Sequence, residues 1–259
     1  MFDARALGPL TLAALLAGLA SACEIGVGRE PTSPTPAPED DISARVDLRQ
    51  LTPRVFVHTS YRVLPNVGRF PSNGLLVCTR GEGALVDSAW GEGPTARLLE
   101  LAKARGCPVK KAVFTHSHDD RAGGLGTLFA AGVTMYATAK TTTLLAHPGF
   151  RPEPIVSPQR LVLAGVDAEV LDPGPAHAPD NVVVSLPGEG VLFGGCMVKA
   201  GDAKTLGNVA DASLGTWTQA LDAVEARYGA ATVVVPGHGA AGGPELLRHT
   251  RELVARAPR

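Results

Sequence analysis

Residues 115–121 read Thr-His-Ser-His-Asp-Asp-Arg and directly follow the short apolar run 112–114, Ala-Val-Phe. The apolar run predicts a buried strand that leads into a polar loop. In an extended loop alternate side chains project to one side, so His116, His118 and Asp120 can converge on one point. Imidazole and carboxylate groups are zinc ligands, and three of them from one turn leave coordination positions free. The segment therefore predicts a metal site, whereas two histidines without the carboxylate would equally fit a polar surface loop.

Three further candidate ligands each follow a predicted strand, namely His177, Cys196 and His238. Taken singly, such a cysteine is more often a buried core thiol, and a loop histidine is more often solvated. Together with the first three they make a set large enough for two metal sites. The other histidines lack comparable settings and are interpreted as ordinary surface or helix residues: His58, His147 and His249.

The composition of the chain indicates a folded protein with a substantial core. Its 259 residues are 45% hydrophobic, which suits one large domain or two small ones. The 24 basic and 25 acidic residues give a net charge of −1, so there is no surplus of positive charge to neutralise the phosphates of a nucleic acid. Four cysteines are too few for a disulfide-stapled scaffold.

Strand-like and helix-like patterns alternate from residue 46 to residue 259. Two short apolar runs at 74–78 and 83–87 flank a glycine-containing turn and predict a hairpin. The order of the elements indicates sheets covered by helices, which is an α/β fold. The further expected strands are 112–114, 134–139, 167–171, 181–186, 190–193 and 231–235, and the expected helices are 94–105, 214–228 and 246–254.

Residues 1–22 have the pattern of a secretory signal peptide. Arg5 precedes an apolar run at 6–20, which Pro9 interrupts and which is shorter than the roughly 20 residues of a membrane-spanning helix. Small residues precede Cys23, as in bacterial lipoproteins, in which this cysteine is lipidated and becomes the first mature residue. An ordinary cleaved signal and an uncleaved anchor are the alternatives.

The proline-rich segment 23–45 predicts an extended spacer between this leader and the folded domain. The leader predicts a periplasmic protein, with a lipid anchor in the outer membrane if Cys23 is acylated.

Three motifs follow one another along the chain: His-x-His-x-Asp-Arg at 116–121, Gly-Gly-Cys-x-x-Lys at 194–199 and Leu-Gly-Asn-x-x-Asp-Ala at 206–212. By these motifs the chain resembles, over most of residues 46–259, the class B metallo-β-lactamases of the subclass that has a three-histidine site and an Asp/Cys/His site. The resemblance implies an αββα sandwich with two zinc ions at one edge between the sheets.

The resemblance also assigns roles to individual residues. It implies that His116, His118 and His177 bind the first zinc, and that Asp120, Cys196 and His238 bind the second. It places Asp87 and Arg121 behind these ligands, although an aspartate at the end of a strand equally fits a turn cap. The implied catalytic residues are Asp120, Lys199 and Asn208, and the implied substrate contacts are Lys199, Asn208, Tyr61, Phe70 and Trp90. The apolar segment between Tyr61 and Phe70 would be a flap over the substrate, or a plain hairpin.

The implied function is zinc-dependent hydrolysis of the β-lactam amide bond of penicillins, cephalosporins and carbapenems by metal-bound hydroxide, which confers antibiotic resistance. Lys199 would pair with the substrate carboxylate, and a solvated lysine is its alternative. One rival function is another metallo-hydrolase of the same fold, of the hydroxyacylglutathione thioesterase type, in which a histidine stands in place of Arg121. The other is a non-catalytic zinc-binding envelope lipoprotein, which needs neither Lys199 nor Asn208. We expect a monomer that acts on a small molecule.

Two cysteines have no role in this scheme, namely Cys78 and Cys107. An oxidising compartment would permit a bridge between them. Both stand at the ends of apolar elements, so we interpret them as buried core thiols, with a disulfide as the alternative.

Overall fold

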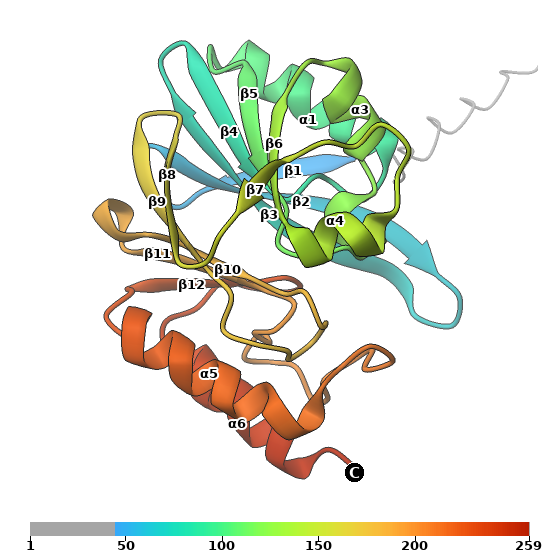
Figure 1. The fold of residues 1–259 in the computed structure, drawn as a ribbon, viewed down its shortest axis with the longest axis vertical. Helices are drawn as coiled ribbons and strands as arrows, with labels where there is room; N and C mark the ends of the chain where they lie inside the picture. Colours follow the sequence, from blue (N-terminus) through green and yellow to red (C-terminus); the bar gives the residue numbers. More distant parts are fainter. Residues whose placement is uncertain (1–44, 259) are drawn as a thin grey trace, which may run out of the picture. The chain divides into compact units, whose positions relative to one another are not determined.

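The computed structural model describes residues 45–258. The predicted signal peptide, Cys23 and all of the spacer except Arg45 lie outside the described residues. The described chain forms two sheets, and helices cover the outer face of each (Figure 1). This arrangement confirms the αββα sandwich.

The first sheet has seven strands in the order in which they occur in the sequence. The first four pair antiparallel and the last four pair parallel, with β4 belonging to both groups. The strands are β1 (Val46–Gln50), β2 (Val55–Leu64), β3 (Gly68–Thr79), β4 (Glu82–Val86), β5 (Val109–Val113), β6 (Thr134–Thr138) and β7 (Glu153–Ile155).

The second sheet has five strands in the order β12-β11-β10-β9-β8. Only β11 and β12 pair parallel, because the chain crosses over between them through a helix. The strands are β8 (Gln159–Leu163), β9 (Val166–Leu171), β10 (Val183–Leu186), β11 (Val191–Gly195) and β12 (Val233–Pro236).

The long helices match the predicted ones closely, and three short helices and one 3₁₀ turn were not predicted. The expected helices are α1 (Glu92–Ala104), α5 (Leu214–Tyr228) and α6 (Glu245–Arg256). The additional ones are α2 (Asp119–Ala122), α3 (Leu125–Ala130), α4 (Ala139–Leu145) and the 3₁₀ turn η1 (Pro187–Glu189). Each of these additional elements is at most seven residues long, too short for a periodic apolar pattern to reveal it.

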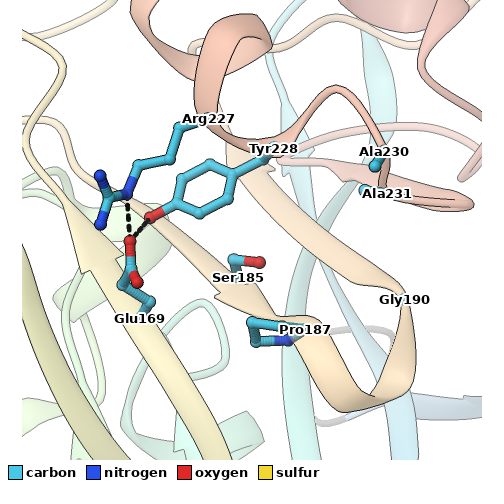
Figure 2. A pocket seen from close by; sticks show the side chains of 8 residues that line it. All are labelled: Glu169, Ser185, Pro187, Gly190, Arg227, Tyr228, Ala230 and Ala231. Carbon is cyan, nitrogen blue, oxygen red and sulfur yellow. Dashed lines mark hydrogen bonds and ion pairs between the residues drawn. The ribbon is translucent and has the colours of Figure 1, made fainter.

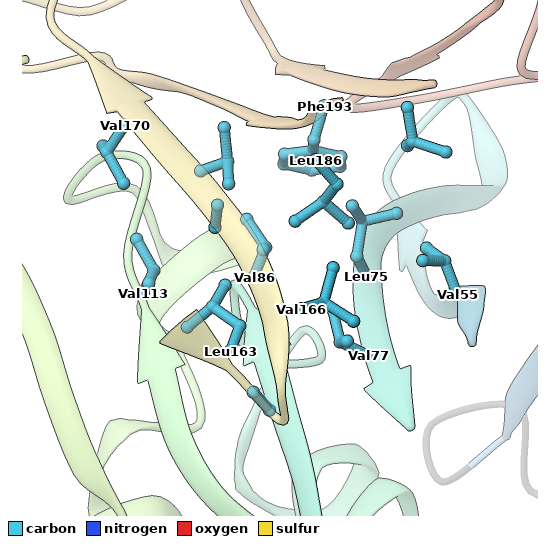
Figure 3. Packing of buried hydrophobic residues seen from close by; sticks show 14 of the residues in the cluster. Val55, Leu75, Val77, Val86, Val113, Leu163, Val166, Val170, Leu186 and Phe193 are labelled. Atoms are coloured by element: carbon cyan, nitrogen blue, oxygen red, sulfur yellow. The ribbon is translucent and has the colours of Figure 1, made fainter. Parts of the chain in front are cut away.

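The main core lies between the two sheets, where their inner faces meet. Figure 3 shows side chains from both sheets interdigitating there, with Leu75 and Val86 on one side and Val170 and Phe193 on the other. All four are fully buried. Burying such side chains stabilises the sandwich by about 1.5–3 kcal/mol each relative to exposure.

Two further apolar clusters attach the helices to the outer faces. One joins α1 and α3 to the first sheet through Leu76, Leu98 and Leu128. The other joins α5 and α6 to the second sheet through Trp217 and Leu247. Each sheet is therefore packed on both of its faces. This packing fixes the strands and the loops that follow them.

Cys78 and Cys107 form a disulfide with their Cα atoms 5.4 Å apart, so our interpretation of them as free core thiols is wrong. Cys78 is the register partner of Gly83 in the neighbouring strand. A Cβ atom at Gly83 would lie 2.4 Å from the Cys107 carbonyl oxygen. The glycine therefore leaves room for the segment before β5 to approach β3 and bring the two sulfur atoms together.

The interpretation of His58 is also wrong. His58 lies on β2 and is fully buried, whereas His147 is exposed in a loop and His249 is half-buried on α6, as expected. Within residues 45–258, none of the helices has the length and apolar character needed to cross a bilayer.

Candidate metal centre

The loop after β5 is extended only up to His118. The backbone of His118 has φ −65° and ψ 151°, and α2 then begins at Asp119. Asp120 therefore lies in a helical turn and does not continue the alternation that we expected. It nevertheless reaches the same cluster, because one of its carboxylate oxygens lies within 4.8 Å of ligand atoms of His116 and Cys196.

Backbone hydrogen bonds bring the distant segments to this loop. The amide of Ser117 donates to Asp180 Oδ2 at 2.9 Å, which ties the metal loop to the segment that carries His177. The amide of Gly237 donates to the carbonyl oxygen of Gly195 at 2.7 Å, which places the segments of Cys196 and His238 side by side. The four predicted ligand segments therefore meet at one end of the sandwich.

The three histidines of the first group face one another. Their rings stand edge to face, with centroids 4.7–5.1 Å apart. Nδ1 of His118 and Nε2 of His177 approach to 3.2 Å, and His116 Nε2 is buried without a hydrogen-bond partner. Burial lowers the pKa of His116 well below its usual value, so this imidazole is neutral, as a metal ligand must be. Neutral nitrogen atoms that converge without partners fit a zinc ion.

The outer nitrogen of three imidazoles is anchored, and this determines which nitrogen faces the cluster. His118 donates from Nε2 to Asp211 Oδ2 at 2.9 Å. His238 donates from Nδ1 to the carbonyl oxygen of Pro71 at 2.7 Å. His116 Nδ1 lies 3.3 Å from the hydroxyl of Thr115.

The second group combines oxygen, sulfur and nitrogen. Cys196 Sγ lies 3.4 Å from Asp120 Oδ2 and 3.3 Å from His238 Nε2, and His238 Nε2 lies 3.3 Å from Asp120 Oδ2. Carboxylate, thiolate and imidazole are all zinc donors, so the set fits Zn²⁺. Burial opposes a charge on His238, but the Cys196 sulfur and Asp120 raise its pKa to about 9 in the absence of metal. Zinc binding at this group therefore displaces a proton.

Arg121 holds Asp120 from behind. It is fully buried and donates to Asp120 Oδ2 from Nε at 3.0 Å and from Nη2 at 2.7 Å. It also donates to the carbonyl oxygens of Gly237 and Asn73. Burial alone would raise the pKa of Asp120, but the adjacent guanidinium holds it well below the usual range. The carboxylate is therefore ionised whenever the protein is folded near neutral pH.

Asp87 links Arg121 to the start of the metal loop. Its two carboxylate oxygens accept from the amide and the hydroxyl of Thr115, both at 2.7 Å, and Oδ2 lies 3.6 Å from the Arg121 guanidinium. Burial raises the pKa of Asp87 to about 7 against the pull of these partners. Asp87 therefore holds the loop that carries the metal ligands, which is more than the turn cap that was its alternative role.

A cavity of about 480 Å³ opens beside both groups. Lys199 forms part of its wall, only 9% exposed, with Nζ 5.4 Å from the centroid of the Trp217 ring. Burial lowers the pKa of this lysine. The lining includes Leu64, Phe70, Trp90, His118, Asp120, His177, Lys199, Lys204, Asn208 and His238.

Tyr61 is not among the lining residues of this cavity. Its hydroxyl donates to Asp47 Oδ2 at 2.7 Å, and the Arg69 guanidinium stacks over its ring. The segment between Tyr61 and Phe70 is the end of the β2–β3 hairpin, where Val63 and Val67 are each more than 60% exposed.

Several residues that shape the centre were not predicted from the sequence. Asp211 belongs to the Leu-Gly-Asn-x-x-Asp-Ala motif, which was the available signal for it. Asp119 accepts from Trp90 Nε1 at 3.1 Å and pairs with Arg62, so it ties the hairpin to the metal loop. Nothing in the local sequence around Arg62 indicates this contact.

A second cavity, of about 350 Å³, lies on another part of the second sheet (Figure 2). Glu169 accepts there from Arg227 and from the Tyr228 hydroxyl. The Glu169 carboxylate is therefore already paired with these two neighbours.

The fold and the ligand set together define a zinc hydrolase with two adjacent metal sites. The family model described as the metallo-beta-lactamase superfamily matches residues 67–238. The chain belongs to this superfamily.

Curated relatives and solved structures agree with this assignment. The chain is 38% identical to a type 2 metallo-beta-lactamase of Bacillus cereus over 213 residues, which is 81% of this chain and 82% of the relative. It is 36% identical to one from Bacteroides fragilis over 217 residues, covering 82% and 87% of the two chains. A metallo-beta-lactamase structure from Pontibacter korlensis superposes with a TM-score of 0.78 at 38% identity, covering 82% of this chain and all of that one. The mono-zinc form of FIM-1 from Pseudomonas aeruginosa gives 0.75 at 37% identity, covering 82% and 95%.

Proposed function

We propose that the protein hydrolyses the amide bond of β-lactams in a zinc-dependent reaction. The observation that carries this proposal is the placement of Lys199 in the wall of a cavity that also adjoins both ligand groups. Penicillins, cephalosporins and carbapenems all carry a carboxylate beside the lactam ring. A buried cation next to a hydrolytic metal site matches that pair of functional groups.

Zinc at these two groups supplies an activated water and an electrophile for the lactam carbonyl. The chain contributes the rest of the chemistry. Lys199 holds the substrate carboxylate, and the Asn208 side chain donates to the carbonyl oxygen as charge develops there. Asp120 serves as a ligand rather than as an acid, because Arg121 keeps it ionised. Phe70 and Trp90 form an apolar wall that limits the access of water.

The β2–β3 hairpin supports a role as a flap. Leu64 beside the turn and Phe70 near the start of β3 line the cavity, whereas Val63 and Val67 at the same end of the hairpin are exposed to solvent. Movement of this end toward the cavity would bring Leu64 and Phe70 against a bound substrate.

The test is hydrolysis of a chromogenic cephalosporin, with zinc content determined on the same sample. We expect turnover that a chelator abolishes and added zinc restores. Lys103→Ala, which removes an exposed lysine on α1, is the matched control for changes at Lys199 and should leave the rates unchanged. Hydrolysis of S-lactoylglutathione but not of the cephalosporin would favour the thioesterase alternative. Zinc binding without turnover of either compound would favour a zinc-binding envelope protein.

We also propose that the protein acts in the periplasm, anchored through Cys23. The Cys78–Cys107 disulfide supports an oxidising compartment, because such bridges persist outside the cytoplasm. The anchored form should partition with membranes, and Cys23→Ala should release or stall it without a change in zinc content. A wild-type protein found wholly in the soluble periplasmic fraction would overturn the anchor.

A further inference from the structure

His58 is a fully buried histidine that the proposed reaction does not use. Its Nε2 lies 3.2 Å from the backbone carbonyl oxygen of Asp87, and its Nδ1 is buried without a hydrogen-bond partner. Burial lowers its pKa to about 4, so the ring is neutral near neutral pH. The carbonyl group can only accept, so the single ring proton is on Nε2.

The neighbouring strand is shaped to admit this ring. Gly74 in β3 is the register partner of His58 in β2. A Cβ atom at Gly74 would lie 2.2 Å from His58 Nε2 and 2.6 Å from the carbonyl oxygen of Val86. The imidazole therefore occupies the space over a glycine and reaches across β3 to the end of β4.

Asp87, which His58 contacts, has a conformation that requires support. Its φ is +64°, in the left-handed region that residues other than glycine seldom adopt. Such a conformation persists where the surroundings fix it at several points. The Asp87 amide donates to the Val113 carbonyl oxygen at 2.8 Å, the carboxylate is held by Thr115, and His58 donates to the carbonyl oxygen.

We infer that His58 is a positioning residue for the Asp/Cys/His metal group and acts through Asp87. By fixing the Asp87 peptide it keeps the carboxylate against Thr115 and beside Arg121, and Arg121 in turn holds the ligand Asp120. His58 itself is not among the residues that line the cavity. The inference rests on metal binding in the proposed function and is independent of which substrate is hydrolysed.

The matched variants are His58→Gln and His58→Met. The two side chains are similar in length and volume, but only glutamine carries an N–H donor that can reach the place of Nε2. Methionine suits a buried strand position, so we expect the His58→Met protein to fold. The comparison therefore isolates the hydrogen bond to Asp87 from the filling of space.

The probe is cobalt(II) titrated into the zinc-free protein, which needs no turnover. Absorption from thiolate-to-cobalt charge transfer reports the group that contains Cys196, and the remaining visible bands report the three-histidine group. We expect His58→Met to raise the cobalt dissociation constant of the Cys196 group about 10-fold, as with other residues that orient ligands. The three-histidine group should be unchanged, and His58→Gln should stay within about 2-fold of the wild type.

Leu128→Ala is the control for general destabilisation. Leu128 lies on α3 and is fully buried in the outer cluster that attaches α1 and α3 to the first sheet. It should lower the thermal midpoint and leave both cobalt constants in place. Equal binding by His58→Met and the wild type would overturn the inference. Equal losses in both His58 variants would also overturn it. A purely structural role for His58 would not distinguish glutamine, which carries a donor, from methionine, which does not. A failure of β-lactam hydrolysis in the wild type would leave the cobalt result standing.

Discussion

His118 Nε2 lies 2.9 Å from Asp211 Oδ2, and this contact joins the metal loop to the exposed segment that also carries Asn208. The pair fixes the orientation of the His118 ring, because Nε2 is occupied and Nδ1 is turned toward His177. An aspartate that orients an imidazole also increases its basicity as a ligand.

Replacing Asp211 should therefore weaken the first zinc. For Asp211→Asn we expect the zinc dissociation constant of the three-histidine group to rise about 10-fold, measured by competition with a chromophoric chelator. The Asp/Cys/His group should keep its affinity. Asp222→Asn is the matched control, because Asp222 lies on α5 and pairs with Arg251 on α6. Unchanged affinity in Asp211→Asn would mean that the contact does not orient the ligand.

Cys196→Ser should affect the other group. A serine hydroxyl stays protonated at neutral pH and cannot replace a thiolate, so the second zinc should be lost on gel filtration. Elemental analysis should find one zinc per chain instead of two, and the hydrolysis rate should fall. Retention of two zinc ions with full activity would show that Cys196 is not a ligand.

Lys199→Ala should lower kcat/KM about 10- to 100-fold on a free-acid β-lactam, because a charge-assisted hydrogen bond of about 1.5–3 kcal/mol is lost. The loss should lie in KM, since the carboxylate is held alike in the ground and transition states. A β-lactam ester should be nearly indifferent to the change, and zinc content should stay constant. Equal losses on the acid and the ester would assign Lys199 a different role.

The pH dependence of KM should report the loss of charge on Lys199. Burial lowers the pKa of Lys199, so it loses its charge at a lower pH than an exposed lysine does. KM for the free acid should therefore rise as the pH is raised into the alkaline range. Lys199→Arg stays charged there and should remove the rise.

The stability of the zinc-free protein should depend on His58 at acidic pH. Its pKa is about 4 in the folded protein against 6.5 when unfolded, so the unfolded chain binds the proton more tightly. The contribution of the neutral His58 to the free energy of unfolding is present in full above pH 6.5. About 3 kcal/mol of it is lost as the pH falls toward 4. Denaturant unfolding at pH 7 and pH 4 should show a smaller loss in His58→Gln. Equal pH dependence in the two proteins would contradict the buried neutral state.

The disulfide should be visible by thiol counting. The denatured, unreduced and zinc-free mature protein should show one free thiol if Cys23 is acylated, namely Cys196. Replacing both Cys78 and Cys107 with alanine should lower the free energy of unfolding by about 3 kcal/mol, as expected for a bridge that spans 29 positions. A count of three thiols would contradict the bridge.

The ligand candidates were accessible from the sequence because each lies in a loop or turn that follows an apolar strand. Such strands are local patterns, and strand ends in a layered fold gather at one edge. The features that were missed depend on contacts between segments. His58 is buried because Gly74 stands opposite it in β3, and Cys107 reaches Cys78 because Gly83 lies between them. Strand register determines both contacts, and no short window of sequence contains it.

The helical turn at Asp120 was missed for a related reason. The turn from Asp119 to Ala122 is too short for a periodic signal, and it is fixed by the contacts of Arg121 with Asn73 and Gly237. The residue types at the site could be predicted, whereas the backbone that presents them is set by distant partners.

The chain has two tryptophans, and both stand beside metal ligands from opposite groups. The Trp90 ring lies 6.5 Å from His238, and the Trp217 ring lies 6.0 Å from His177 and under the Lys199 ammonium group. The tryptophan emission of the protein therefore originates next to the centre. A quenching metal such as cobalt should dim Trp217 on entering one group and Trp90 on entering the other. With Trp90→Phe and Trp217→Phe, the unlabelled protein becomes its own optical sensor for the order in which its sites fill.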